Sequence, residues 1–433
     1  MDYDQALQYI KDCTKFGVKL GLERITEILK RLGDPQRKFP SIHIAGTNGK
    51  GSTAAMFDAV LREAAYKTGR YTSPHLSSYR ERFTVNGRPI SPAKLGEIAA
   101  QIKPVIESVR EDGFGGPTEF EVGTALAFEF FAQSGVDIAI IEVGMGGRFD
   151  ATNVIQPAFS VITHLALDHQ RYLGATLNQI AFEKAGIIKP KIPVVIGIQE
   201  PGIEDYLSEI ARFRGSEVKK ASEIKLLENQ SRIEGAWIEA GDPYWGIIQA
   251  KIGLIGSHQA RNSLNVIAGT EFLARAGFNI TKTNLANGLS KTVWPGRFER
   301  VPGLGPLTLY LDGAHNPDGV SALAATWQEL YPHQKADLLV GILNDRPLLE
   351  MAALFSPITR RVIVTEVPDP KTASAAELGA VFTQLGVPTI IEPAPEAALQ
   401  LLLKTTNPFA LVSGSLYLIG LLRPVLIKDQ SDV

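Results

Sequence analysis

The residues best placed to do chemistry form the glycine-rich heptapeptide GTNGKGS, residues 46–52. An apolar run precedes the heptapeptide and an alanine-rich run with helical spacing follows it, which predicts a strand, a turn and a helix. Glycines let the backbone curl around an anion, and the free N–H groups at a helix start point at it. The heptapeptide therefore predicts a nucleotide-phosphate site. Its expected members are Asn48, Gly49, Lys50, Gly51 and Ser52, with the lysine reaching the terminal phosphates.

The heptapeptide departs from the strict phosphate-loop pattern G-x-x-x-x-G-K-S/T. Gly51 follows Lys50 directly, so the hydroxyl that can face Mg²⁺ comes one place later, at Ser52. The first glycine also lies nearer to the lysine. Because glycines mark ordinary tight turns too, the prediction depends on the lysine, the hydroxyl and the strand–helix setting taken together.

Acidic and imidazole side chains follow other apolar runs. Glu142 ends the run DIAIIE, and Asp168 and His169 follow FSVITHLAL. Ligands bind beyond the carboxyl ends of strands in open α/β sheets, so we predict that Glu142 holds the Mg²⁺ that accompanies a nucleotide. The spacing alone leaves metal binding, proton transfer and a structural role open for His169.

Four further positions carry charge in informative settings. Lys184 lies in IAFEKAGIIKP, a predicted helix on which an ordinary surface charge and a catalytic role both stay open. Asp312 and His315 lie in LDGAHN after another apolar run, where nucleotide contact and a simple Asp-Gly-Asn turn are both possible readings. Arg297 precedes them in a linker, from which it can span a crevice between domains.

The elements that must position these residues alternate between short apolar runs and longer amphipathic runs up to about residue 190. This alternation is typical of a largely parallel sheet with helices between its strands. Residues 41–45, 137–143 and 159–167 are predicted to be buried strands. The less regular residues 199–256 predict antiparallel strands that close the first domain.

A proline- and glycine-rich segment, residues 294–306, predicts a domain boundary. The fold class is therefore expected to be α/β. A P-loop-type, mostly parallel sheet would form an ATP-binding domain of residues 1–295, and a smaller Rossmann-like α/β domain would follow in residues 296–433.

The bulk composition limits the classes of function. The 433 residues carry 44 basic and 46 acidic side chains, for a net charge of −2, which argues against a dominant nucleic-acid surface. The single cysteine, Cys13, excludes an internal disulfide framework and fits a reducing compartment. No uninterrupted apolar span is long enough for a membrane helix. We expect a cytoplasmic protein.

Taken in order, the motifs resemble those of the folylpolyglutamate synthase/dihydrofolate synthase family, which belongs to the Mur ligase superfamily. The resemblance covers residues from about 15 to 420. The motifs are KFGVKLGLERI, HIAGTNGKGS, YTSPHLSSYRERF, TEFEVGTALAF, IEVGMGGRFDATN, ITHLALDHQRYLG, IAFEKAGIIK, SHQARN, WPGRFE, DGAHNPDG and SGSLYL.

The resemblance implies an ATP-dependent amide ligase. In that family the carboxylate of dihydropteroate or a reduced folate attacks the γ-phosphate of ATP, and the amino group of L-glutamate then displaces phosphate from the acyl phosphate. A carboxylate is a poor acyl donor, so phosphorylation supplies a leaving group, and cations must offset the charge of the transferring phosphoryl group. A monomer is expected, with no nucleic-acid or membrane partner.

The resemblance also implies roles for individual residues. Ser73, Glu142 and His169 match Mg²⁺ ligands, and two ions are expected. Lys184 matches a lysine that the family carbamylates, and Lys50, Lys184 and His315 are the expected catalytic residues. Asn262, Arg297 and Asp312 match ATP contacts beside the phosphate loop. The expected pterin-side residues are Leu20, Gly21, Thr118, Glu119, Phe120, Phe149, Asp150 and Ala151.

Two departures and three alternatives stay open. Phe83 replaces a smaller apolar residue, and GILNDRP replaces a common Lys-Asp pair, which leaves any glutamate or folate contact at residues 344–347 undecided. The alternatives are another Mur-type amino-acid ligase, a P-loop phosphotransferase or NTP-driven switch that forms no amide, and a non-catalytic nucleotide-binding module. The motifs do not distinguish dihydrofolate synthase from folylpolyglutamate synthase activity.

Overall fold

The computed structural model describes residues 1–13 and 21–427 of the chain. The chain divides into two compact units. The first consists of Met1–Glu228, Ile238–Lys251 and Arg261–Thr292, and the second of Asn229–Trp237, Ile252–Ala260 and Val293–Val433. Two short segments that precede the proline- and glycine-rich linker thus group with the second unit. The division into functional domains of residues 1–295 and 296–433 stays a prediction.

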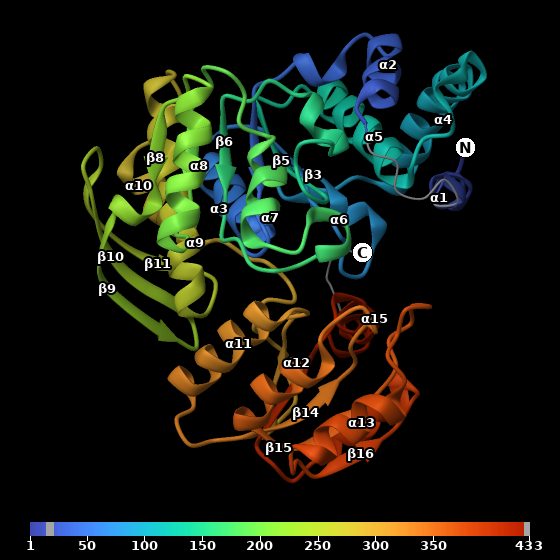
Figure 1. The fold of residues 1–433 in the computed structure, drawn as a ribbon, viewed down its shortest axis with the longest axis vertical. Coiled ribbons are helices and arrows are strands. Elements are labelled where there is room, and N and C mark those ends of the chain that lie inside the picture. The colour runs from blue at the N-terminus through green and yellow to red at the C-terminus, as the bar shows by residue number, and fades with distance from the viewer. Residues whose placement is uncertain (14–20, 428–433) are drawn as a thin grey trace. The chain divides into compact units, whose positions relative to one another are not determined.

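The first unit is built on an eight-stranded sheet with the order β4-β3-β2-β5-β1-β6-β7-β8 (Figure 1). Its strands are β1 (Ser41–Ala45), β2 (Thr68–Tyr71), β3 (Phe83–Val85), β4 (Arg88–Pro89), β5 (Ile138–Glu142), β6 (Phe159–Ile162), β7 (Val194–Ile196) and β8 (Val218–Lys220). Neighbours from β2 to β8 are parallel, and β3 and β4 add an antiparallel edge. The carboxyl end of β1 therefore lies between those of β5 and β6.

Helices connect most of these strands, as parallel neighbours require. The helices between residues 1 and 290 are α1 (Tyr3–Asp12), α2 (Glu23–Arg31), α3 (Lys50–Glu63), α4 (Pro92–Val109), α5 (Glu119–Ser134), α6 (Gln170–Leu173), α7 (Leu177–Ala185), α8 (Pro201–Phe213), α9 (Ser257–Arg275) and α10 (Lys282–Ser290). Strands β1 and β5 are buried at every position, which explains their almost continuous apolar sequences. One apolar cluster joins α1, α2, α4 and α5 to the sheet, and a second joins α7 and α8.

The third predicted strand is shorter than expected. Residues 159–167 were predicted to be one strand, but β6 ends at Ile162. The chain leaves the sheet there because its next groups bind the phosphate loop. The His164 carbonyl accepts hydrogen bonds from the backbone nitrogens of Thr47 and Asn48 at 2.9 and 3.2 Å. The continuous apolar run concealed this early ending.

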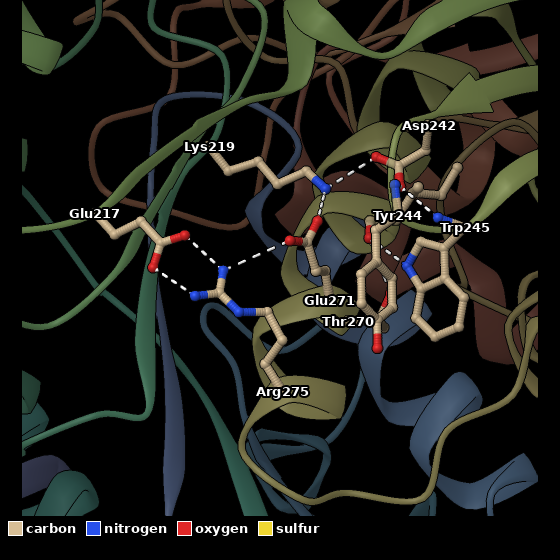
Figure 2. Close-up of polar contacts among 9 residues, drawn as sticks. Glu217, Lys219, Asp242, Tyr244, Trp245, Thr270, Glu271 and Arg275 are labelled. Carbon is tan, nitrogen blue, oxygen red and sulfur yellow. Dashed lines mark hydrogen bonds and ion pairs between the residues drawn. The ribbon is translucent and has the colours of Figure 1, made fainter.

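A smaller sheet with the order β11-β10-β9 follows in the chain. Its strands are β9 (Lys225–Arg232), β10 (Gly235–Asp242) and β11 (Gly246–Ile252). Within the first unit, a charge network joins the end of β10 to β8 and α9 (Figure 2). Lys219 of β8 contacts Asp242 at 2.9 Å and also Glu271 of α9, and Arg275 bonds Glu217 at 2.5 Å. Strand β8 is an edge strand of the large sheet, and charged side chains on an edge strand disfavour pairing with another chain.

The second unit is a six-stranded sheet with the order β12-β13-β17-β14-β15-β16. Its strands are β12 (Glu299–Arg300), β13 (Thr308–Leu311), β14 (Ala336–Val340), β15 (Thr359–Val364), β16 (Thr389–Ile391) and β17 (Phe409–Ser413). Only β12 is antiparallel to its neighbour in this sheet. The accompanying helices are α11 (Pro317–Leu330), α12 (Leu348–Phe355), α13 (Ala375–Gln384), α14 (Pro395–Leu403) and α15 (Leu416–Leu426) (Figure 1).

These two units confirm the predicted α/β class, with a mostly parallel sheet in each. The second core gathers around Trp327, which is fully buried among Phe298, Tyr310 and other aromatic rings. Within residues 1–13 and 21–427, no helix combines the length and the apolar character that a membrane crossing needs.

Candidate active site

The phosphate loop joins β1 to α3 and needs glycine at two positions. Gly46 has a φ of 156°, and a Cβ atom there would lie 1.8 Å from the Thr163 hydroxyl oxygen. Gly49 caps α3 with a φ of 85°, and its Cβ would lie 2.4 Å from Oδ1 of Asn262 on α9. A left-handed backbone and a close neighbour both exclude larger side chains. The structure therefore places Asn262 against the loop.

The segment after β6 holds the loop in this shape. The Thr163 hydroxyl donates to the Asn48 carbonyl at 2.8 Å, and the Thr47 hydroxyl donates to the Ala166 carbonyl at 3.1 Å. Together with the two bonds to the His164 carbonyl, these contacts hold Thr47 and Asn48 in place. The loop is thus preorganised before a ligand binds.

Two lysine side chains meet at the loop. Lys50 Nζ donates to the carbonyls of Gly46 and Thr47 at 3.1 and 3.2 Å, and Lys184 Nζ donates to the Gly46 carbonyl at 2.7 Å. Lys184 is only 4% exposed, so its interpretation as a surface charge is wrong. Burial, and next the positive charge of Lys50, lower the pKa of Lys184 to about 7.

Glu142 lies at the end of β5, as predicted from its run. It is buried, and its Oε2 accepts a hydrogen bond from the Ser73 backbone nitrogen at 3.1 Å. The structure thus brings these two expected metal ligands together. His169 caps the short α6 with a left-handed φ of 51°, and its side chain is 42% exposed beside Asp168.

The described ranges contain no group of three or more His, Cys, Asp and Glu residues that could hold a metal ion. This donor set still fits Mg²⁺ bound to a nucleotide, because Mg²⁺ keeps several waters and takes one or two carboxylates besides phosphate oxygens. Buried Glu142 supplies such a carboxylate at the same sheet edge as the phosphate loop. A site that encloses the ion with protein ligands alone does not fit the described residues.

Most of the expected pterin-side residues lie in two segments, the start of α5 and the segment that follows β5. Thr118 caps α5, and the Phe120 ring packs on Tyr71 with centroids 5.8 Å apart. A Cβ at Gly144, just after β5, would lie 2.6 Å from the Phe120 ring. Asp150 is buried farther along that loop. The structure therefore brings the Thr118–Phe120 turn against the loop that carries Asp150.

Hydrogen bonds fix the Asp150 carboxylate in place. Oδ1 accepts from the Thr152 hydroxyl at 2.5 Å, and Oδ2 accepts from the Met145 nitrogen at 3.0 Å. Burial nevertheless raises the pKa of Asp150 above its usual value. Ala151 begins the short helical turn Ala151–Val154, whereas Phe149 is 39% exposed with the Arg148 guanidinium 4.4 Å from its ring centroid.

The last three expected pterin-side residues are Glu119, Gly21 and Leu20. Glu119 pairs with Arg82 at 3.4 Å. Gly21 has a φ of 134° and lies two residues before the start of α2. Leu20 lies outside the described residues.

In the second unit, Asp312 follows β13 directly, as expected. Its Oδ2 accepts from the Phe298 nitrogen at 2.8 Å, and its Oδ1 accepts from the Ala314 nitrogen at 2.9 Å. Burial raises the pKa of Asp312, although the charge of Arg297 opposes the shift. His315 Nδ1 donates to the Gly313 carbonyl at 2.8 Å. These bonds show that Asp312 and His315 lie in a hydrogen-bonded turn, and they leave a contact with nucleotide as a prediction.

Arg297 belongs to the same group of side chains. A Cβ at Gly313 would lie 2.4 Å from Arg297 Nη1. The structure thus brings together three residues that the sequence separates by 15 and 18 positions, Arg297, Asp312 and His315.

Sequence reasoning missed several residues that shape the site. Thr163 and His43 lie in two motifs of the resemblance, ITHLALDHQRYLG and HIAGTNGKGS, but no role was predicted for either residue. Arg24 and Glu121, which form a buried ion pair, lie in the motifs KFGVKLGLERI and TEFEVGTALAF, again without a predicted role. The Thr-x-x-Glu spacing that ends at Glu121 is a capping-box signature and could have drawn attention to it.

Comparison with known proteins shows the family of the chain. Residues 44–269 match the Mur ligase middle domain, and residues 296–416 match the Mur ligase glutamate ligase domain. The chain is 35% identical over 431 residues to the dihydrofolate synthase/folylpolyglutamate synthase of Bacillus subtilis (strain 168), a match that covers 97% of this chain and 98% of that protein. The chain belongs to this family of Mur ligases.

Other members of the family agree over the whole length. The folylpolyglutamate synthase of Lacticaseibacillus casei is 33% identical over 434 residues, covering 100% of both chains. Among solved structures, Mycobacterium tuberculosis folylpolyglutamate synthase complexed with ADP has a TM-score of 0.90 at 32% identity and covers 99% of this chain and 100% of its own. An FPGS–AMPPCP–folate complex has a TM-score of 0.85 at 31% identity, covering 99% and 100%.

Proposed function

We propose that this protein is an ATP-dependent ligase that joins L-glutamate to dihydropteroate, a reduced folate or both. ADP and inorganic phosphate are the other products. The observation that carries the proposal is the buried amine of Lys184 on the phosphate loop, 2.7 Å from the Gly46 carbonyl, in a chain that matches folate ligases over nearly its full length. A simple phosphotransferase loop gives no reason to bury a second lysine there.

The proposed reaction has two steps. The acceptor carboxylate attacks the γ-phosphorus of ATP, which forms a C–O–P linkage and releases ADP. The α-amino group of glutamate then attacks the acyl carbon, loses a proton and displaces phosphate. The N–H groups at the start of α3 and the ammonium of Lys50 offset charge on the transferring group. Lys50 must exchange its two carbonyl acceptors for phosphate oxygens.

Magnesium belongs to this proposal, with two ions expected. We assign Ser73, Glu142 and His169 as its ligands from the chain. A bound Mg²⁺ ion supplies positive charge that stabilises the phosphoryl oxygens. The Ser73 nitrogen holds Glu142 Oε2 at 3.1 Å, so this carboxylate is oriented before any ligand arrives.

Lys184 is proposed to carry a carbamate. Its neutral Nζ would attack CO₂, which forms a C–N bond and releases one proton to solvent. The pKa of about 7 leaves a large neutral fraction at neutral pH. Carbamylation would replace an ammonium beside Lys50 with an anionic oxygen donor and relieve the repulsion between the two lysines. The resulting oxygen would add to the donor set of Glu142.

The remaining residues are assigned by place. Asn262 lies against Gly49 and is proposed to contact the nucleotide, as are Arg297 and Asp312, with His315 beside them as a catalytic residue. The acceptor pocket is proposed to include Leu20, Gly21, Thr118, Glu119, Phe120, Phe149, Asp150 and Ala151. Phe120 offers a flat ring on which a pterin can stack.

We further propose a cytoplasmic monomer, consistent with a single cysteine.

One assay tests the ligase. Phosphate release from ATP is expected to require glutamate together with dihydropteroate or tetrahydrofolate, and the isolated product is expected to carry one more glutamyl residue. If the rate of ATP hydrolysis does not depend on glutamate, the proposed ligase activity is rejected. A stable phosphorylated acceptor would indicate a phosphotransferase. Side-by-side kinetics with the two acceptors decide between the two synthase activities.

A further inference from the structure

Arg24 and Glu121 form a buried ion pair between α2 and α5. Arg24 Nε lies 3.0 Å from both carboxylate oxygens of Glu121, and Nη2 lies 2.6 Å from Oε2. The residues are 9% and 4% exposed. Two nitrogens of one guanidinium, Nε and Nη2, thus bind the carboxylate, which lysine cannot reproduce.

The same carboxylate also holds the turn at the start of α5. Glu121 Oε2 accepts from the Thr118 backbone nitrogen at 2.8 Å and from the Thr118 hydroxyl at 2.9 Å. The Glu121 nitrogen donates back to that hydroxyl at 3.2 Å. One carboxylate therefore binds the guanidinium of α2 and both polar groups of Thr118. Removing the guanidinium would leave a buried charge with weaker support.

The pair connects the two segments that are proposed to receive the acceptor. Arg24 lies three positions after Gly21 on the helix that begins at Glu23, and Thr118 lies two positions before Phe120. The next residue in each helix, Ile25 and Val122, belongs to one buried apolar cluster. A buried ion pair in such a core is often no more stable than apolar residues of the same size, so stability alone is a poor reason for it.

We infer that Arg24 is a positioning residue for the acceptor pocket. It acts through Glu121 to hold the Thr118–Phe120 turn and to fix that turn to the start of α2. The inference rests on the proposed function, because it concerns the pocket for the pterin-bearing acceptor. It assigns no contact with substrate to Arg24 itself. A displaced turn would weaken acceptor binding. The phosphate loop, which lies between β1 and α3, would stay unchanged.

The test separates the acceptor from the nucleotide. For Arg24→Met, the KM for dihydropteroate or tetrahydrofolate is expected to rise about tenfold or more, with the KM for ATP within about twofold of wild type. Arg24→Lys keeps the positive charge but loses the two-pronged contact, so its KM for the acceptor should lie between those of wild type and Arg24→Met. Glu121→Gln should resemble Arg24→Met. The acceptor is whichever compound the wild-type protein uses.

Arg31→Met is the matched control. Arg31 ends the same helix, and it pairs with Glu27 and Asp112 at 2.8 and 2.7 Å on the surface. Its loss should leave both KM values unchanged. Far-UV circular dichroism and AMPPCP binding check that each variant is folded.

The outcomes are distinct. An unchanged acceptor KM in folded Arg24 variants, or an equal rise in both KM values, overturns the inference while the ligase stands. If Arg24→Met does not fold, Arg24→Lys and Glu121→Gln decide by the same criterion. A wild-type protein without acceptor-dependent phosphate release rejects the proposed function itself, and the inference with it.

Discussion

Lys50 and Lys184 donate to the same carbonyl oxygen, that of Gly46, at 3.1 and 2.7 Å. Two ammonium groups near one acceptor repel each other, and the buried one has the lowered pKa. The Gly46 carbonyl thereby joins the end of α7 to the phosphate loop. A change in the charge of Lys184 therefore acts directly on Lys50, the lysine that is proposed to contact the nucleotide.

The first prediction concerns this lysine. Lys184→Ala should lower the rate of glutamate-dependent phosphate release by about 100-fold or more, because it removes the proposed carbamate donor. The fold should persist, since alanine suits a helix and leaves no buried charge behind. Stopped assays of phosphate release and far-UV circular dichroism measure the two effects.

Lys67→Ala removes a lysine on the surface, where Nζ donates to the Ser134 carbonyl, and serves as the control. A carbon-13 NMR signal from labelled CO₂ should appear on the wild-type protein and be lost in Lys184→Ala. A near-normal rate for Lys184→Ala would reject the carbamate for this protein.

A second prediction concerns the left-handed backbone at Gly49. Gly49→Ala should weaken AMPPCP binding about tenfold or more, because the new Cβ would meet Asn262 at 2.4 Å and φ is 85°. The free energy of unfolding should also fall by about 1 kcal/mol or more. Isothermal titration calorimetry and urea unfolding give the two values.

Gly202→Ala is the matched control, because nothing lies within 4 Å of a Cβ atom there. Its position on α8 predicts equal or slightly higher stability, by about 0.5 kcal/mol, and wild-type nucleotide affinity. Equal affinities for the two variants would contradict the account of the loop.

A third prediction concerns magnesium. Removing divalent cations with EDTA should abolish phosphate release, and added Mg²⁺ should restore it. Glu142→Gln should raise the Mg²⁺ concentration for half-maximal activity about tenfold or more, since a neutral amide is a weaker ligand than a carboxylate. Glu107→Gln, on the surface of α4, should leave that concentration unchanged. A magnesium requirement that is identical in both variants would remove Glu142 from the ligand set.

The fourth prediction follows from His43, a fully buried residue of β1. Its Nε2 lies 2.8 Å from the Thr152 hydroxyl, whose proton is directed to Asp150. His43 is therefore expected to carry its proton on Nε2. Burial, and next the charge of Lys189, lower its pKa to about 3, so it stays neutral in the folded protein.

In the unfolded chain a histidine has a pKa of about 6.5 and takes up a proton as the pH falls. The unfolded state then binds more protons, and the free energy of unfolding must decrease between about pH 6.5 and pH 3. At pH 5 the loss from His43 should be about 2 kcal/mol relative to pH 7. Urea unfolding of wild type and His43→Gln at both values should show a shallower decrease for the variant.

His333→Gln removes an exposed imidazole and controls for the loss of any histidine. The comparison between variants also removes the contribution of Asp150, whose raised pKa acts in the opposite direction at low pH. Identical pH profiles for wild type and His43→Gln would disprove the role of His43.

The sequence predicted best what depends on neighbours in the chain. Strand β1 spans residues 41–45 as expected, and Glu142 ends its strand, because short apolar runs and glycine turns are local signals. The resemblance added Asn262, which lies more than 200 residues beyond the loop it touches.

Contacts between distant segments were beyond local reasoning. The burial of Lys184 arises because the end of α7 packs against the phosphate loop, which its own helix sequence does not reveal. The early end of β6 likewise depends on hydrogen bonds to Thr47 and Asn48. The partner of Arg24 is 97 residues away, and only the packed structure pairs them.

The charge network around Lys219 and Arg275 has a consequence for synthesis of the chain. Its members come from residues 217–219, the end of β10 and α9, so Lys219 on the edge strand β8 lacks its partner Glu271 until α9 has been synthesised. A truncated chain that stops before α9 would present this edge strand without the network and would lack Asn262 as well. Premature termination in this region should therefore yield insoluble fragments rather than a smaller working domain.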